Sequence, residues 1–155
     1  ILSDLNKCYP FASDEAQEKV QRFLGETSAR ITHDAMAALE SGDAQRIGEL
    51  MLEAQAQFDS EVAPACTTQL TAPVLHKVLN HASLRDHVHG GKGVGSQGDG
   101  TAQFIAKDAA SQAKVVEIIE KEEQRQVEER NGHQLSANAD QQAGDGVTED
   151  SGYNA

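Results

Sequence analysis

The sequence predicts an α+β fold that consists mainly of helices, and three observations lead to this prediction. Apolar residues recur at helical spacing between Asp14 and Phe58, and capping residues mark where each run begins. The segment 101–106 has the composition of a short strand. Directly before it, six of the eleven residues from Gly90 to Gly100 are glycine. Because glycine costs conformational entropy on folding, such a concentration needs a cause, and this stretch is the leading candidate for a functional site.

Length and composition limit the class of protein. A chain of 155 residues has room for one hydrophobic core, and a formal net charge of −12 argues against a nucleic-acid surface, which needs clustered Lys and Arg. The same charge argues against an anionic membrane, and no apolar run approaches the roughly 20 residues of a transmembrane helix. We therefore expect a soluble, acidic cytoplasmic protein. Cys8 and Cys66 lie far apart and are expected to be buried free thiols.

The first half is predicted to contain a helical hairpin. Asp14 is a good N-cap for a first helix, and Gly25 provides a stop. A second helix is expected over about 27–41, and Asp43 caps a third. The short break between the second and third helices predicts that they are antiparallel. Their apolar faces contain Ile31, Ala35, Ala38 and Leu39 on the second helix, and Ile47, Leu50, Met51, Ala54 and Phe58 on the third.

The second half contains the glycine stretch and two further helices. Segment 62–70 is expected to be a connection, and Pro73 is placed to begin a fourth helix. Asp108 caps a fifth helix, which continues after Glu120 as a charged extension with nothing to bury. The residues expected to face inward from it are Ala109, Ala113 and Val116, with Val115 and Ile119 as further candidates. Residues 131–155 contain no Lys or Arg and few apolar residues, so we expect disorder there.

The glycine stretch matches two nucleotide-binding motifs only superficially. Residues 93–98 read Gly-x-Gly-x-x-Gly, but the dinucleotide fingerprint needs a helix after the loop, whereas a strand follows here. A Walker A loop ends in Gly-Lys-Ser/Thr, but Lys92 precedes these glycines. Two interpretations remain: a glycine-rich hairpin without a ligand, or a nest of backbone N–H groups that binds an anion. In the second, Lys92 would add charge, and Ser96, Gln97 and Asp99 would add polar contacts.

Residues 91–106, Gly-Lys-Gly-Val-Gly-Ser-Gln-Gly-Asp-Gly-Thr-Ala-Gln-Phe-Ile-Ala, resemble the third signature motif of the GHMP small-molecule kinases. This superfamily includes galactokinases, homoserine kinases, mevalonate kinases and phosphomevalonate kinases. Its motif is a Lys, a Gly-Ala-Gly-Gly-Gly-type loop and an apolar strand. The resemblance covers 1–122 and implies a helix-rich GHMP-kinase C-terminal-like domain with a small antiparallel sheet. A charged helical extension and a disordered acidic tail over 123–155 would follow.

The resemblance implies an ATP-dependent kinase that phosphorylates a small hydroxylated metabolite, with a sugar-like acceptor favoured over a mevalonate-like one. In this family ATP and Mg²⁺ are bound mainly by an N-terminal domain, which carries a Pro-x-x-x-Gly-Leu-x-Ser-Ser-Ala loop that these residues do not contain. We assign no catalytic residue to this chain and expect it to be inactive alone, with its own N-terminal kinase domain as partner. GHMP kinases are often dimers, which makes a homodimer a candidate assembly. The phosphate- or substrate-binding residues implied are Lys92, Gly95, Ser96, Gln97, Gly98, Asp99 and Gly100.

The sequence departs from the family motif at three positions of the loop. Gln97 and Asp99 stand where glycine is common, and Ser96 stands where alanine is common. A carboxylate beside a phosphoryl group is repulsive, so Asp99 either faces the substrate or caps a turn.

Two other functions are alternatives to the kinase. The chain could be a non-catalytic module that binds a small anion with the same glycine nest. A metal site could be formed by the four histidines between positions 76 and 89, but zinc ligands usually show tighter patterns with Cys, so we expect no metal. The histidines concerned are His76, His81, His87 and His89. The chain opens on Ile1 in a sequence typical of the middle of a protein, and we expect a further segment before it.

Overall fold

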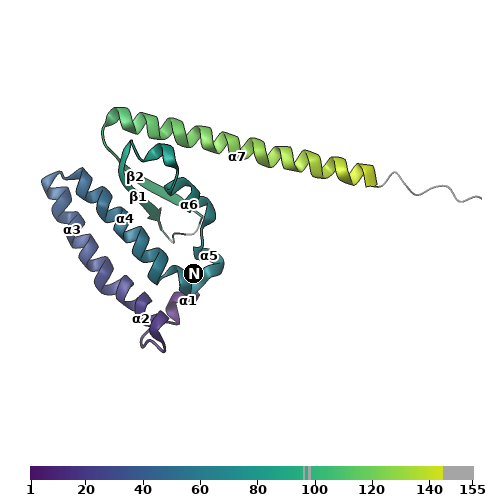
Figure 1. Cartoon of the computed structure of the whole chain (residues 1–155). Helices are drawn as coiled ribbons and strands as arrows, with labels where there is room; N and C mark the ends of the chain where they lie inside the picture. Colours follow the sequence, from purple (N-terminus) through teal and green to yellow (C-terminus); the bar gives the residue numbers. More distant parts are fainter. Residues whose placement is uncertain (96, 98, 145–155) are drawn as a thin grey trace, which may run out of the picture. The chain divides into compact units, whose positions relative to one another are not determined.

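The computed structural model describes residues 1–95, 97 and 99–144, with the side chains of these residues except Leu2 and 129–144. The fold is α+β, with many helices and one two-stranded antiparallel sheet (Figure 1). The chain divides into two compact units, Ile1–Val116 and Glu117–Ala155. None of the helices in the part that the structure describes has the length and apolar character needed to cross a membrane.

The helical hairpin predicted in the first half is confirmed. The helices that precede the sheet are α1 (Leu2–Asn6), α2 (Glu15–Arg22), α3 (Ser28–Ser41), α4 (Ala44–Glu61), α5 (Thr67–Leu70) and α6 (Pro73–Leu79), with a π-helical turn η1 (Phe23–Thr27) and 3₁₀ turns η2 (Ala63–Cys66) and η3 (Ala82–Leu84). The Asp14 side chain accepts a hydrogen bond from the Gln17 nitrogen and caps α2, as expected. Gly42 ends α3 with a left-handed φ of 70°, and Asp43 caps α4. These residues set the hairpin between α3 and α4.

The prediction that Gly25 stops a helix is wrong. The chain stays helical from α2 through η1 into α3. Glycine ends a helix by taking a left-handed φ, whereas the glycines with positive φ among the described residues are Gly42 and Gly95. Phe23 and Thr27, on the same turn, are buried, and the Ser28 hydroxyl donates to the Phe23 carbonyl at 2.7 Å. Packing of this turn therefore overrides the local preference of the glycine.

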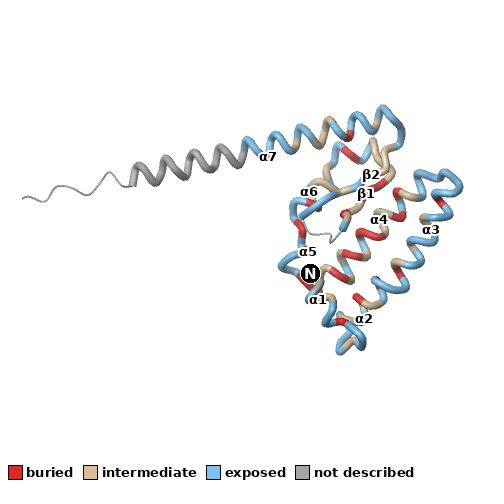
Figure 2. The backbone as a smooth tube through the Cα atoms, turned by 180° about the vertical axis from the view of Figure 1, so that it is seen from behind, coloured by how far each residue is buried: buried red, intermediate tan, exposed pale blue. Residues whose placement is uncertain are grey.

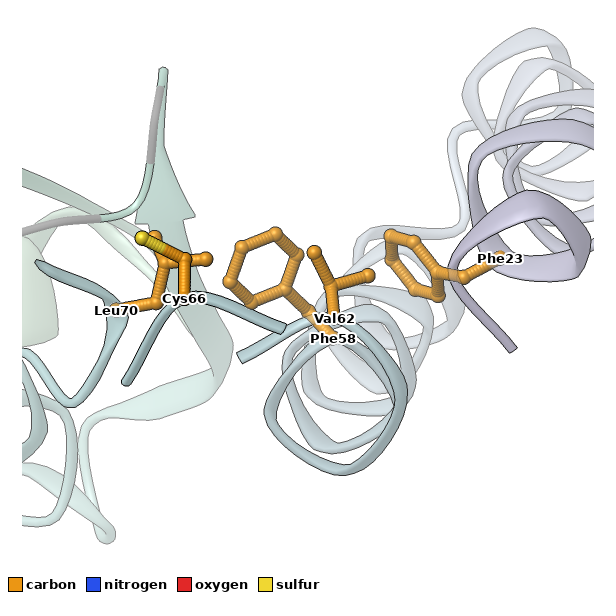
Figure 3. Packing of buried hydrophobic residues seen from close by; sticks show 5 residues of the cluster. All are labelled: Phe23, Phe58, Val62, Cys66 and Leu70. Atoms are coloured by element: carbon orange, nitrogen blue, oxygen red, sulfur yellow. The ribbon is translucent and has the colours of Figure 1, made fainter. Parts of the chain in front are cut away.

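One hydrophobic cluster joins the end of α4 to η1 and α5. Phe23 and Phe58 meet edge to face, with ring centroids 5.7 Å apart (Figure 3). Val62, Cys66 and Leu70 complete the cluster. Segment 62–70, predicted as a connection, instead contains two short helical turns, η2 and α5, and supplies Val62, Cys66 and Leu70 to the cluster. Cys66 and Cys8 are buried free thiols, as expected.

The sheet packs against the hairpin through α4, which lies between α3 and the strands (Figure 1). Buried residues recur along α4, in keeping with this central place (Figure 2). Strand β1 (Val88–Val94) pairs antiparallel with β2 (Thr101–Ala106), from Val88 opposite Ala106 to Val94 opposite Thr101. The strand predicted over 101–106 is confirmed. The loop predicted over 90–100 is shorter than expected, because 90–94 belong to β1.

Helix α7 (Ala109–Gly144) begins where predicted, because Asp108 accepts a hydrogen bond from the Ser111 nitrogen at 2.7 Å. Its expected inner face is wrong in part: Val115 is buried, whereas Val116 is 49% exposed, and Ala109 and Ala113 are exposed. Either valine suits the apolar pattern, and only tertiary packing selects between neighbours 100° apart on a helix. The expected disorder from residue 131 is not confirmed, since α7 runs to Gly144 and residues 145–155 lie outside the described residues.

Candidate functional site

The glycines at the start of the stretch serve close packing. A Cβ atom on Gly90 would overlap the carbonyl oxygen of Gly48 and lie 2.9 Å from its Cα. A Cβ atom on Gly48 would in turn lie 2.8 Å from the Gly90 nitrogen, so the backbones of α4 and β1 touch at this pair. Gly91 lies against the ring of Phe104, and a Cβ on Gly93 would lie 2.7 Å from Leu75. These three β1 glycines are therefore explained without a ligand.

Sequence reasoning did not identify Gly48. Its signal was a glycine in the middle of a helix, where it is less favourable than alanine by about 1 kcal/mol. That cost indicates a packing requirement at the position. The requirement arises because β1 crosses α4 at Gly48 and leaves no room for a side chain.

Gly95 and Gly100 belong to the turn between β1 and β2. Gly95 has a φ of +74°, and nothing lies within 4 Å of a Cβ built there. Gln97 also has a positive φ, of 56°. Gly100 directly precedes β2. Ser96 and Gly98, the other predicted ligands of this turn, lie outside the described residues.

Asp99 caps α6. Its Oδ1 accepts hydrogen bonds from the backbone nitrogens of Val74 at 2.8 Å and Leu75 at 3.0 Å. These N–H groups are in the first turn of α6, where no preceding carbonyl can accept them. The expectation from the sequence is that Asp99 faces the substrate or caps a turn, whereas the observed partners are backbone groups of a helix 24 and 25 residues earlier in the chain. The carboxylate thereby links the turn to α6. One of its oxygens accepts from neutral N–H groups.

A hydrogen-bonded chain connects the end of β1, just before the turn, to α4 and α6. The Gly93 nitrogen donates to Gln55 Oε1 at 2.7 Å, and Gln55 Nε2 donates to Asp59 Oδ1 at 2.8 Å. Asp59 Oδ2 lies 2.9 Å from His76 Nε2, and His76 Nδ1 lies 2.9 Å from the Ala72 carbonyl. The hydrogen bond to Asp59, and then that to Ala72, raise the pKa of His76. Both ring nitrogens face acceptors, which favours the doubly protonated imidazolium.

Sequence reasoning also missed Gln55 and Asp59. Gln55 is 8% exposed on a helix whose buried face is otherwise apolar. A polar residue beside Ala54 in that stripe, with Asp59 four residues later, was the available signal. It predicts a buried polar contact, but the partners on β1 and α6 depend on the fold.

A groove runs beside the turn, between η1, α3 and α4. Its volume is about 460 Å³. Lys92, Gly95 and Gln97 line it from the hairpin. Its other walls are mainly apolar and include Leu24, Ile31, Ala35, Ile47, Leu50 and Met51.

Lys92 brings a positive charge to this groove. Its Nζ donates to the Gly93 carbonyl at 2.6 Å, and burial lowers the pKa of the amine. Within the described residues, Lys92 has no carboxylate at ion-pair distance. Gln97 Oε1 is buried and has no hydrogen-bond partner in this part of the chain. The groove therefore offers an ammonium that has no ion-pair partner among the described residues, beside an apolar wall.

The four histidines do not form a metal centre in the described part of the chain. His76 is engaged with Asp59, and no group of three or more His, Cys, Asp or Glu side chains in the described ranges is placed to hold a metal ion.

Compared with known proteins, the chain matches no family model and no curated protein.

Proposed function

We propose that the chain is the C-terminal part of an ATP-dependent kinase of the GHMP type, which phosphorylates a hydroxyl group of a small metabolite. In this proposal the turn 95–100 lines the phosphate side of the cleft. The observation that carries it is that the β1–β2 hairpin is held at two points, to α4 through Gly93 of β1 and Gln55, and to α6 through Asp99 of the turn. Phosphoryl transfer depends mainly on positioning and electrostatic stabilisation, so a fixed turn is the part that such an enzyme requires.

The chemistry of the turn suits an anionic ligand. Gly95 has no side chain and open space around it, so a ligand can approach the backbone closely. Lys92, which lies on β1 before the turn and lines the groove, supplies a positive charge for a phosphate or for an anionic group of the acceptor, and no described carboxylate pairs with it. Asp99, which would repel a phosphoryl group, is engaged by two N–H groups of α6. The substitution of aspartate for the family's glycine is therefore compatible with phosphate beside the turn.

The intact enzyme would take most of its machinery from a preceding domain. That domain would bind ATP and Mg²⁺ and supply the catalytic groups. Residues 1–155 alone would not catalyse phosphoryl transfer. The proposed location is the cytoplasm, and a homodimer is a candidate assembly. The contribution of this chain is limited to shaping and positioning, through the turn and the groove.

A non-catalytic module that binds a small anion is a second candidate. The observation that favours it is that the described contacts of Lys92, and those of Asp99 in the turn, are made to residues of this chain. The same residues could therefore bind an anion without a second domain.

Acceptor-dependent ADP formation by the intact protein, including whatever precedes Ile1, tests the kinase. We expect activity with one member of a panel of hydroxylated metabolites. Asp99→Ala should lower kcat/KM at least tenfold, because the turn loses its attachment to α6. Asp99→Asn, the matched variant, should keep most of the activity, because its amide oxygen still accepts from Val74 and Leu75.

Titration of residues 1–155 with pyrophosphate, followed by NMR of the backbone amides, separates the two candidates. Shifts at Gly93 and Gly95 without ADP formation by the intact protein would support the anion-binding module and exclude the kinase. Neither shifts nor ADP formation would refute both. Loss of activity in Asp99→Asn would show that the carboxylate itself meets the substrate.

A further inference from the structure

We propose that the groove between α3 and α4 binds an amphiphilic carboxylic acid, with the carboxylate on Lys92 and an apolar body along the helices. Under the proposed function this molecule is the phosphate acceptor, and that assignment rests on the kinase proposal. The binding itself does not, because the groove and its ammonium lie entirely within unit Ile1–Val116.

The charge of the ligand follows from Lys92. The chain has 25 Asp and Glu residues against 13 Lys and Arg, yet within the described residues no carboxylate pairs with this amine. A partly buried ammonium whose acceptor here is one carbonyl is incompletely compensated, and buried charges are normally paired. A single ammonium matches one negative charge, which a carboxylate carries at neutral pH, whereas a phosphate monoester carries nearly two.

The apolar side chains that line the groove indicate that the rest of the ligand is apolar. Ile31, Ile47 and Met51 line the groove with partly exposed apolar side chains. Leu50 lies beneath them, 1% exposed. A sugar ring carries a hydroxyl on most of its carbons, and these would lose their hydrogen bonds to water against such walls. The groove thus disfavours the sugar-like acceptor expected from the sequence.

Gln97 adds a point of recognition for a hydroxyl. Gln97 lines the groove, and its Oε1, which is buried, has no donor in the described part of the chain. A ligand hydroxyl could donate to it and thereby be placed beside Gly95, on the turn assigned to the phosphate side. A hydroxylated, apolar carboxylic acid satisfies Lys92, Gln97 and the walls together.

NMR titration of residues 1–155 with octanoate tests the groove, with acetate and octanol as matched probes. We expect octanoate to cause saturable shifts of amides along the groove, such as those of Ile31, Met51 and Lys92. Acetate, without the apolar body, should cause none at the same concentration. Octanol, without the charge, should bind at least tenfold more weakly.

Variants separate charge from shape. Lys92→Met should weaken octanoate at least tenfold and leave octanol unchanged, whereas Lys19→Met, which removes a surface lysine paired with Glu15, should change neither. Ala35→Leu, which fills the groove, should weaken both probes. Thermal unfolding of each variant confirms that it is folded.

Three results would overturn the inference. One is octanoate binding that is insensitive to both Lys92→Met and Ala35→Leu. Another is shifts that do not saturate or that spread over the molecule. The third is binding to residues 1–155 but not to the intact protein, which would mean that a preceding segment covers the groove. Failure of the kinase assay with octanoate binding intact would remove the acceptor assignment and leave the site.

Discussion

Gly48 and Gly90 form the tightest backbone contact that the glycine stretch makes. Each lacks a side chain at the point where α4 crosses β1, and neither has room for one. Gly95, five residues after Gly90, is different in kind, because it has open space and a left-handed φ. The glycines thus meet two requirements, close approach in β1 and backbone conformation in the turn.

Alanine substitutions distinguish these requirements. We expect Gly90→Ala to lower the free energy of unfolding by about 3 kcal/mol or more, because its Cβ would overlap a helix carbonyl that cannot move alone. Gly95→Ala should cost only about 1–2 kcal/mol, the penalty for an L-residue in the left-handed region. Urea unfolding of both variants measures the difference. Equal losses would contradict the close-approach explanation.

Helix α6 is the element that connects the turn to the helical hairpin. Asp99 of the turn caps its first residues, and His76 in its middle meets Asp59 of α4. The hydrogen bond from the Gly93 nitrogen to Gln55 Oε1 connects β1 to α4 as well. A change in α6 is therefore transmitted to the turn by two routes.

The protonation of His76 should be visible in stability. Its pKa is raised above the ordinary 6.5, mainly by the hydrogen bond to Asp59. A raised pKa in the folded state means that the stabilisation is fully present below pH 6.5 and is lost as the pH rises through the folded value. We expect the free energy of unfolding to fall by less than about 1 kcal/mol, since both side chains are about a third exposed and solvent screens their interaction.

Unfolding free energies measured across this pH range test the effect. His76→Gln should remove the loss above pH 6.5. His33→Gln is the control, because the His33 side chain is 87% exposed, and this variant should still lose stability above pH 6.5. A wild-type curve and a His76→Gln curve that run parallel would exclude the contribution.

The element boundaries that the sequence predicted well are those set by local chemistry. Asp14, Gly42, Asp43 and Asp108 each satisfy their own neighbouring backbone groups, so their effect can be read without the fold. Gly25 failed because burial of the turn around it decides the outcome. Strand β1 was missed because four of its seven residues are Gly or Lys, and its pairing with β2 is what makes it a strand.

The candidate site was predictable to a similar extent. The position of the turn and its residue types follow from the sequence. The assignment of Asp99 to α6 and of Gly93 to Gln55 does not, because these bonds join residues 24 to 38 positions apart. Leu39, expected to face inward, is 71% exposed, which shows the same dependence on tertiary packing.

The folded core belongs to the first of the two units. Every buried apolar residue in the described part of the chain, from Cys8 to Val115, lies within Ile1–Val116. In the second unit, the described side chains from Glu120 onward are mostly charged, and Val127 is 43% exposed. The stretch holds local pairs such as Glu117 with Lys121, each of which contributes only a few tenths of a kcal/mol. Stability should therefore depend on the first unit.

Shortening the chain tests this division. A chain that ends at Glu122 should keep its free energy of unfolding within about 0.5 kcal/mol of the full value, because no buried apolar contact is removed. Its far-UV circular dichroism should lose the helical signal of the deleted part of α7. A chain that ends at Lys107 is the matched comparison and should be less stable, since it lacks Val115, which is 7% exposed. If ending at Glu122 lowers stability as much as ending at Lys107 does, residues 123–155 contribute to the fold and the division is wrong.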